Sequence, residues 1–141
     1  MKILEVLTRR RKIGNIGEKF AARLLKKEGY KILERNYVAF DSEIDIICEN
    51  KTELSFVEVK TRTQGNGNPR ERRPASAVTP DKQRKIISAA KYYLGTHRCE
   101  KRVSLDIVEV YLNADGKPER AVHIENAFNR NTANEKRRKY L

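Results

Sequence analysis

Two strand-like runs flank a polar turn in Glu43–Thr61, EIDIICENKTELSFVEVKT, and this pattern indicates a β-sheet at the centre of the chain. The runs Glu43–Cys48 and Leu54–Thr61 are rich in β-branched and other apolar residues, and Glu49–Thr52 separates them with turn-forming residues. A third run of the same kind, Asn36–Phe40, lies before them in the chain, and two polar residues separate it from Glu43. The three runs predict an antiparallel meander.

The first of these two strands separates charged from apolar side chains, because side chains alternate between the two faces of a strand. Glu43 and Asp45 are predicted to share one face, and Ile44, Ile46 and Cys48 to share the other. We expect the apolar face to enter the core.

The second strand has the same pattern, with Glu58 and Lys60 on one face and Val57 and Val59 on the opposite face. A hairpin that turns near residues 50–51 brings Asp45 to within about 5 to 8 Å of the region around Glu58. Two acids and a lysine are therefore predicted to converge.

Two carboxylates at this distance repel one another, and a divalent cation relieves the repulsion. Hard oxygen ligands completed by a few waters suit Mg²⁺, with Mn²⁺ as a substitute. Such an ion polarises a phosphoryl oxygen and activates water, while a nearby ammonium group stabilises developing charge. Alternating charges are also typical of any half-solvated antiparallel strand, so the pattern alone leaves both interpretations open.

Helices are predicted on both sides of the three strands. Over Ile13–Lys27, apolar residues recur at every third or fourth position, and Gly29 follows the last turn. A second helix is predicted to begin at Pro80 with Thr79 as its N-cap and to end at Gly95.

The remaining chain completes an αβββαββ order of elements. Val103–Tyr111 and Arg120–Glu125 are predicted strands, and Arg62–Ala77, which contains two glycines, two prolines and four arginines, is a predicted loop. A loop of this length either binds a ligand or is disordered, and the sequence does not decide between the two. The length of 141 residues fits one domain, predicted over residues 1–128, and residues 129–141 are a predicted disordered basic tail.

Composition points to a polyanionic partner, because 31 Lys and Arg against 19 Asp and Glu give a net charge of +12. No apolar stretch approaches the roughly 20 residues that cross a bilayer, so we expect no membrane association. Cys48 and Cys99 lack the spacing of a disulfide framework or a zinc site, which indicates a cytoplasmic protein. His97 and His123 are isolated, which argues against a histidine-based catalytic site.

The chain resembles the YraN family of predicted endonucleases, which is similar in turn to archaeal Holliday junction resolvases and to the PD-(D/E)xK nuclease superfamily. The resemblance covers roughly Ile13–Phe128 and implies an α/β fold with a restriction-endonuclease-like αβββαβ core, in which helices flank a mixed central sheet. It rests on five runs in the family's order, Gly17–Glu18, Ser42–Ile47, Phe56–Arg62, Ala77–Val78 ahead of Lys82, and Leu105–Val108.

The resemblance also implies roles for individual residues. Asp45 and Glu58 correspond to the metal ligands, together with the Val59 carbonyl, and Glu18 corresponds to an acid of the first helix that helps to hold the metal or its water. Lys60 corresponds to the catalytic lysine. The implied catalytic set is thus three acids and one lysine.

Three nearby positions add to or depart from the family pattern. Glu43 precedes the metal-binding aspartate by two residues and is a secondary candidate, either a supporting acid or a solvated side chain. Ser42 stands where the family commonly has Gly, which implies a different turn, and Val38 stands where it commonly has Arg, which removes one phosphate contact.

We predict that a positive rim around the acids binds nucleic acid, DNA in preference to RNA; a basic surface that is merely solvated is the alternative. Four aromatic residues either stack on bases or belong to the core, namely Tyr37, Phe40, Tyr92 and Tyr93. The predicted rim consists of Arg62, Arg70, Arg72, Arg73, Lys82, Arg84 and Lys85.

The leading hypothesis is a Mg²⁺-dependent endonuclease that hydrolyses DNA phosphodiester bonds, with branched or junction DNA as a candidate substrate in repair or recombination. A catalytically silent module that binds DNA or structured RNA is the alternative, because fold does not guarantee activity. A surface that docks an acidic protein is a third hypothesis, and pairing of two chains into a homodimer is compatible with the first.

Overall fold

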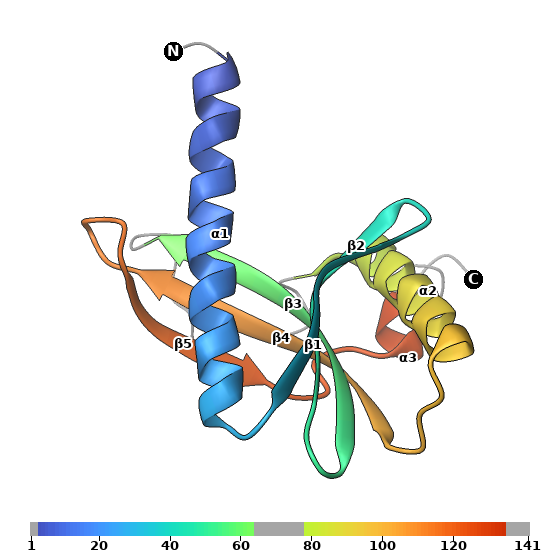
Figure 1. Ribbon diagram of the computed structural model, residues 1–141. Helices are drawn as coiled ribbons and strands as arrows, with labels where there is room; N and C mark the ends of the chain where they lie inside the picture. The colour runs from blue at the N-terminus through green and yellow to red at the C-terminus, as the bar shows by residue number, and fades with distance from the viewer. Residues whose placement is uncertain (1–2, 64–77, 135–141) are drawn as a thin grey trace.

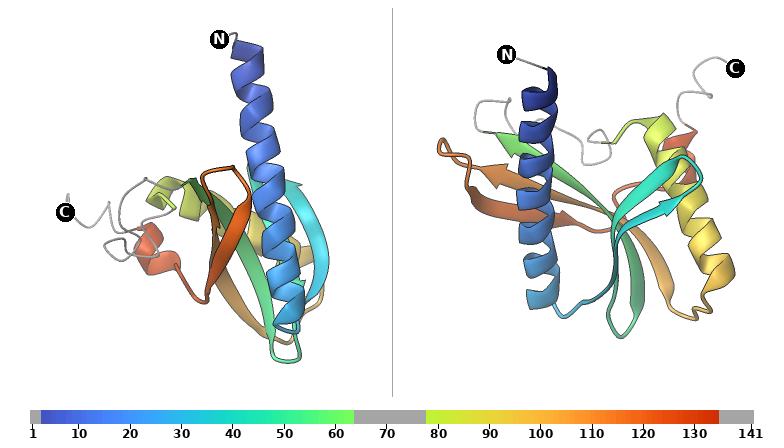
Figure 2. Two further views of the ribbon diagram at one scale, coloured as in Figure 1. Left: turned by 90° about the vertical axis from the view of Figure 1, so that its left-hand side faces the viewer. Right: turned by 45° about the horizontal axis from the view of Figure 1, so that its top comes forward.

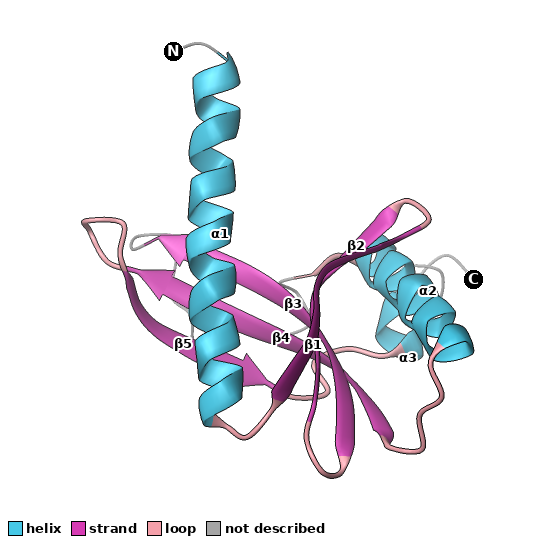
Figure 3. Cartoon of the chain, viewed as in Figure 1, coloured by secondary structure: helices cyan, strands magenta, loops and turns pink. Residues whose placement is uncertain are grey.

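Helices flank one five-stranded sheet in the computed structural model, which describes residues 3–63 and 78–134, with side chains from residue 11 onward (Figures 1 and 3). The mixed α/β composition that the sequence predicts is confirmed. In chain order the elements are α1 (Ile3–Lys27), β1 (Lys31–Ala39), β2 (Ser42–Glu49), β3 (Glu53–Thr63), α2 (Pro80–Thr96), β4 (Arg102–Leu112), β5 (Pro118–Ile124) and α3 (Arg130–Ala133).

The strands lie side by side in their order along the chain, β1-β2-β3-β4-β5. The β1–β2 and β2–β3 pairs are antiparallel, which confirms the predicted meander, and β4–β5 is also antiparallel. The central β3–β4 pair is parallel, so the sheet is mixed. A parallel pair needs a crossover connection, and α2 lies in that connection.

The two long helices contribute to two separate hydrophobic clusters, one on each side of the sheet (Figures 1 and 2). Ala21 and Leu25 of α1 pack with Val57 and Val108 of the central strands. On the other side, α2 packs against the sheet through a second set of buried residues that includes Ile86, Tyr93 and Phe56. None of the helices in the described ranges is both long and apolar enough to cross a bilayer.

Two predicted helix boundaries were wrong. The first helix begins at Ile3 rather than at residue 13, because the preceding residues are mostly good helix formers with no Gly or Pro. The second helix continues through Gly95 to Thr96, since a glycine in the last turn weakens a helix without ending it.

The predicted disordered tail begins with ordered structure. Asn129 caps α3 through a capping box with Thr132, whose hydroxyl also donates to Gln83 Oε1 of α2 at 2.7 Å. Ala133 is buried. These local and tertiary contacts order residues 129–134 in spite of their polar composition, and residues 135–141 lie outside the described part of the chain.

The prediction of one apolar face for Ile44, Ile46 and Cys48 was also wrong. Ile44 belongs to the cluster on the α2 side, whereas Ile46 and Cys48 belong to the cluster on the α1 side. The opposite strand, β1, contains Asn36 at this level with a positive φ of 54°, in the left-handed region that Asn tolerates better than most residues. The β1–β2 hairpin therefore changes faces around Asp45.

Candidate metal centre

Three carboxylates from two elements meet where the hairpin changes faces. Glu18 comes from α1, and Glu43 and Asp45 come from β2; one oxygen of each lies within 4.8 Å of the others. We call this set the three-acid cluster. With its amide oriented to donate, Asn36 places Nδ2 2.8 Å from Glu43 Oε1 and 3.1 Å from Glu18 Oε2. Arg35 Nη2 lies 3.6 Å from Glu18 Oε2.

Glu18 reaches the cluster because α1 packs very closely on β3 at the preceding residue, Gly17. A Cβ atom at Gly17 would lie 2.0 Å from Thr61 Oγ1 and 3.3 Å from Thr61 Cβ. Only glycine fits this contact without displacement of a neighbour, so Gly17 sets the distance of the helix from the strand.

Asp45 is held by the backbone of the neighbouring strand. Its Oδ2 accepts a hydrogen bond of 2.8 Å from the Val59 N–H. Burial, and next the charge of Glu58, raise the pKa of Asp45 to about 8, although the bond from Val59 acts in the opposite direction. The pKa of Glu18 is also raised, by burial above all, against the opposing charge of Arg35. The carboxylates of the site thus carry more negative charge than the neighbouring cations neutralise.

Glu58 is the most buried acid of the site, with 4% of its side chain exposed. Its Oε1 lies 2.8 Å from Lys82 Nζ and 3.8 Å from Lys60 Nζ. Its Oε2 is buried and has no hydrogen-bond partner in the described part of the chain. Burial lowers the pKa of Lys82, but the hydrogen bond and charge of Glu58 outweigh it, so the net pKa is raised. A buried carboxylate oxygen without a partner is uncommon in native structures and calls for a ligand.

Glu43 and Asp45 line a cavity of about 460 Å³ between β2 and the first turns of α2. The β1–β2 turn closes one side of it, where Lys85 Nζ lies 3.4 Å from Asp41 Oδ2. Acidic and basic side chains face one another across this cavity, whose lining is Asp41, Ser42, Glu43, Asp45, Thr79, Asp81, Lys82 and Lys85.

The predicted catalytic residues lie in one region, but the acids group together differently from the expectation. Glu43, the secondary candidate, belongs to the three-acid cluster together with Glu18 and Asp45. Glu58 is electrostatically coupled to Asp45 and is paired with two lysines, one of which is Lys60. Val59 contacts the site through its N–H; the role of its carbonyl as a metal ligand stays a prediction.

Two side chains of the site, Arg35 and Asn36, were not predicted from the sequence. Both lie on β1: Arg35 precedes the predicted strand, which begins at residue 36, and the positive φ of Asn36 breaks the alternation that would assign its face. The sole sequence signal was an asparagine at the start of a strand, a residue type that tolerates left-handed backbone.

The predicted positive rim is largely engaged with acids of the protein itself. Lys82 binds Glu58, and Arg62 Nε lies 3.8 Å from Glu109 Oε2. Arg84 contacts Asp81 and the Ala133 carbonyl, so of the rim residues in the described ranges only Lys85 and Lys82 line the acidic cavity. Arg70, Arg72 and Arg73 lie outside the described residues.

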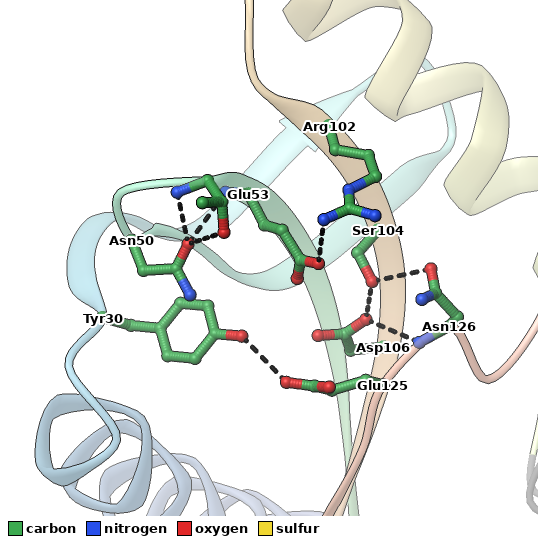
Figure 4. Close-up of polar contacts among 9 residues, drawn as sticks. Tyr30, Asn50, Glu53, Arg102, Ser104, Asp106, Glu125 and Asn126 are labelled. Atoms are coloured by element: carbon green, nitrogen blue, oxygen red, sulfur yellow. Dashed lines mark hydrogen bonds and ion pairs between the residues drawn. The ribbon is translucent and has the colours of Figure 1, made fainter.

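A second group of polar side chains includes Ser104 and Asp106, which are buried on β4, and Asn126, which follows β5 (Figure 4). Asp106 accepts hydrogen bonds from the Ser104 hydroxyl and the Asn126 N–H, and its Oδ2 lies 2.7 Å from His123 Nε2. The other ring nitrogen of His123 lies 2.7 Å from Glu28 Oε2. Asp106, part of a run that carries the family resemblance, thus has a structural role that joins α1, β4 and β5.

These features define a mixed α/β protein with a pocket of carboxylates and lysines between β2 and α2. Residues 17–110 match the Uncharacterised protein family UPF0102. The chain belongs to this family, which is that of the YraN proteins.

Similar proteins come from several bacteria. A UPF0102 protein of Desulfosudis oleivorans is 45% identical over 130 residues, which cover 91% of this chain and 98% of that protein. A UPF0102 protein of Caldanaerobacter subterraneus subsp. tengcongensis is 43% identical over 118 residues, which cover 82% of this chain and 93% of that protein. A UPF0102 protein of Clostridium perfringens is 41% identical over 118 residues, which cover 82% of this chain and 93% of that protein.

Proposed function

We propose that the chain is a metal-dependent endonuclease of the PD-(D/E)xK type, with Mg²⁺ at the three-acid cluster and DNA as its substrate. The observation that carries the proposal is the environment of Glu58: it is a buried carboxylate next to Lys60, its charge raises the pKa of Asp45, and its Oε2 has no hydrogen-bond partner among the described residues. The order α1-β1-β2-β3-α2-β4 agrees with a restriction-endonuclease-like core, and the free cysteines Cys48 and Cys99 agree with a cytoplasmic location.

The donor set fits a hard divalent cation, because it offers only oxygen. Glu18, Glu43 and Asp45 would hold the ion, and Glu58 would reach it through its Oε2, which has no hydrogen-bond partner in the described ranges. The raised pKa values of Asp45 and Glu18 have the same origin, namely burial of neighbouring carboxylates without a sufficient counter-charge. When bound, Mg²⁺ supplies polarisation of the scissile phosphate and a lowered pKa of water.

The protein's own residues would position the reacting groups. The Val59 N–H fixes the orientation of the Asp45 carboxylate, and Asn36 fixes those of Glu43 and Glu18. Lys60, whose side chain is partly exposed and 3.8 Å from Glu58, is the ammonium available to stabilise charge on a phosphate in the transition state.

The test is cleavage of end-labelled single-stranded, duplex, flapped and four-way-junction DNA in Mg²⁺ and in Mn²⁺. We expect the protein to cut at least one substrate, and Glu58→Gln and Asp45→Asn to lose the activity by a factor of 100 or more. Glu53→Gln makes the same chemical change on the same strand, outside the site, and should retain activity. Equal cleavage by all variants would exclude this site as its source.

One observation favours a second candidate, a catalytically silent module that binds DNA or structured RNA. Lys82 and Lys60 already face Glu58 Oε1, so the acid has counter-charges without a metal. A protein that binds these substrates with strong salt dependence, cuts none of them and is not stabilised by Mg²⁺ would be this module.

A further inference from the structure

Two exposed aromatic side chains contact one another beside the candidate metal centre. Phe40, in the turn between β1 and β2, is 74% exposed, and Tyr92, on α2, is 51% exposed. Their ring centroids are 5.3 Å apart with an interplanar angle of 76°. The pair adjoins the acidic cavity, because Phe40 precedes Asp41, which lines that cavity and pairs with Lys85.

The fold separates these two aromatics from the other two that the sequence left undecided. Tyr37 and Tyr93 contact one another at 5.3 Å in the cluster on the α2 side of the sheet, so core packing explains them. Core packing does not explain Phe40 and Tyr92. We call Phe40 and Tyr92 the aromatic edge.

The backbone at Phe40 is unusual as well. Its φ of 58° lies in the left-handed region, which bulky residues seldom adopt. Glycine or asparagine would relieve the strain, whereas phenylalanine keeps it and exposes a ring to solvent. Such backbone outliers cluster at ligand-binding sites.

Charge around the aromatic edge selects among the partners that an apolar patch attracts. Lys85 and Lys82 line the cavity with side chains that are about half exposed, where they pair with Asp41 and Glu58, and Lys91 of α2 is exposed. Ammonium groups beside aromatic rings are the combination that binds single-stranded nucleic acid, because lysines contact phosphates and rings stack on bases. An apolar protein surface would not need the lysines.

We propose that the aromatic edge stacks on an unpaired base. The protein would then prefer nucleic acid that has a single-stranded or locally opened segment next to the phosphodiester bond that lies at the three-acid cluster. This inference rests on the proposed function in taking nucleic acid as the substrate. It adds the substrate class, since a fully paired duplex keeps its bases stacked inside the helix and presents none to Phe40 and Tyr92.

The test is equilibrium binding in Ca²⁺, with no requirement for cleavage, to DNA that carries 2-aminopurine at one position. The probe is placed in a two-nucleotide gap in one set of DNA and in a continuous duplex of the same sequence in the other. We expect tighter binding to the gapped DNA and quenching of the unpaired probe. Phe40→Ala and Tyr92→Ala should weaken gapped-DNA binding roughly 5- to 150-fold, the range for loss of one stacked base, and leave duplex binding nearly unchanged.

Two variants serve as controls. Tyr92→Phe keeps the ring and should keep both the preference and the quenching, whereas Val122→Ala removes an exposed apolar side chain on β5, away from the cavity, and should change neither. Circular dichroism of each variant checks that it folds.

Different experimental results would overturn the stacking inference and the proposed nuclease function. Cleavage that depends on Glu58, with equal binding of gapped and duplex DNA by all variants, would overturn the inference and leave the nuclease. Aromatic-dependent quenching without cleavage would support the inference and favour the silent binding module. Self-association that Phe40→Ala abolishes, without any DNA binding, would overturn the inference and identify the aromatic edge as a contact between two copies of the chain.

Discussion

Glu58 lies in a buried environment that two lysines only partly satisfy. Lys82 donates to one carboxylate oxygen at 2.8 Å, Lys60 lies at 3.8 Å, and the second oxygen has no partner in the described residues. Removal of the partner of a buried charge lowers the free energy of unfolding by more than the loss of a solvent-exposed ion pair does. Lys82, assigned to a phosphate-binding rim by sequence, is therefore a residue of the acidic site.

Lys82→Met should destabilise the protein by about 1 to 2 kcal/mol, because Glu58 loses its closest counter-charge while Lys60 remains. Lys85→Met is the matched control on the same helix; its partner Asp41 is exposed, so we expect a change within about 0.5 kcal/mol. Urea unfolding of both variants checks the difference. Equal effects would mean that the Glu58 contact adds no stability.

Asp45→Asn should stabilise the metal-free protein at pH 8 by about 1 kcal/mol or more. The pKa of Asp45 is raised to about 8 from 3.8, so its ionised form is less favourable in the folded state, and stability is lost as the pH rises between these values. Asparagine keeps an acceptor for the Val59 N–H and removes the charge. Thermal unfolding at pH 8 in EDTA measures this effect.

The same variant tests the metal. In the parent protein, Mg²⁺ at 100 times its Kd should add about 2.7 kcal/mol of stability, and Asp45→Asn should reduce this gain strongly. Asp115→Asn, in the exposed β4–β5 turn, should retain the gain. If Mg²⁺ stabilises Asp45→Asn and the parent protein equally, the ion binds elsewhere.

Strand alternation and hairpin geometry were sufficient to predict from the sequence that Asp45, Glu58 and Lys60 lie near one another. The contacts of Asn36 and Lys82 in the site could not be predicted in this way, for a physical reason. Their roles depend on a left-handed residue in β1 and on the packing of α2 across the sheet, and neither is encoded in local periodicity.

At the scale of elements, the contact between α1 and β3 determines where Glu18 lies. Gly17→Ala should destabilise the protein by about 1 to 3 kcal/mol, because the new Cβ would lie 2.0 Å from Thr61 Oγ1. Gly14→Ala, on the same helix with no described atom within 4 Å of the new Cβ, should instead stabilise by about 0.5 to 1 kcal/mol. Thermal unfolding of the two variants separates packing from helix propensity.

A double variant tests the cause of the Gly17 effect. Thr61→Ala removes the Oγ1 atom and leaves only its Cβ, at 3.3 Å, so it should recover much of the stability lost by Gly17→Ala. Without such recovery, the loss would come from the helix itself rather than from its contact with β3.

The hairpin formed by β1 and β2 shows where prediction by element succeeded and where it did not. Its existence and antiparallel pairing followed from runs of apolar residues and turn chemistry, and both are confirmed. The face change between Ile44 and Ile46 did not follow, because strict alternation assumes a regular strand. It arises at the level of Asn36, where the positive φ interrupts regular backbone geometry.

At the scale of the whole molecule, His123 joins segments far apart in the sequence. It contacts Asp106 on β4 and Glu28 after α1, and the Tyr30 ring packs edge-on against it at 5.7 Å. Burial opposes the charged form of His123, but the hydrogen bonds that its ring donates to Asp106 and Glu28 outweigh it and raise its pKa to about 9.

Stability should therefore fall with increasing pH above neutrality. The contribution of His123 is fully present below about pH 6.5, its pKa in the unfolded chain, and is lost as the pH rises through 9, a change of about 2 to 3 kcal/mol. His123→Gln should remove this part of the pH dependence, and His97→Gln, at the other histidine of the chain, should retain it. Urea unfolding between pH 6 and 10 checks both; an identical pH profile for His123→Gln would refute the assignment.

The overall topology was only partly readable from sequence. The order of helices and strands followed from periodicity and capping residues, whereas the parallel β3–β4 pair, with Glu58 beside Ile107, depends on how α2 carries the chain back across the sheet. No local pattern specifies that long-range pairing.

The change of faces at Asp45 sets a limit on how this sequence can vary. Exchange of one side chain for another alters the chemistry of the site but keeps each residue on its side of the sheet. Deletion of a single residue between Ser42 and Ile46 would shift Ile44 toward the α1 layer or carry the acids away from Glu18, because one step along a strand reverses its faces. The hairpin thus tolerates changes of residue type better than changes of length.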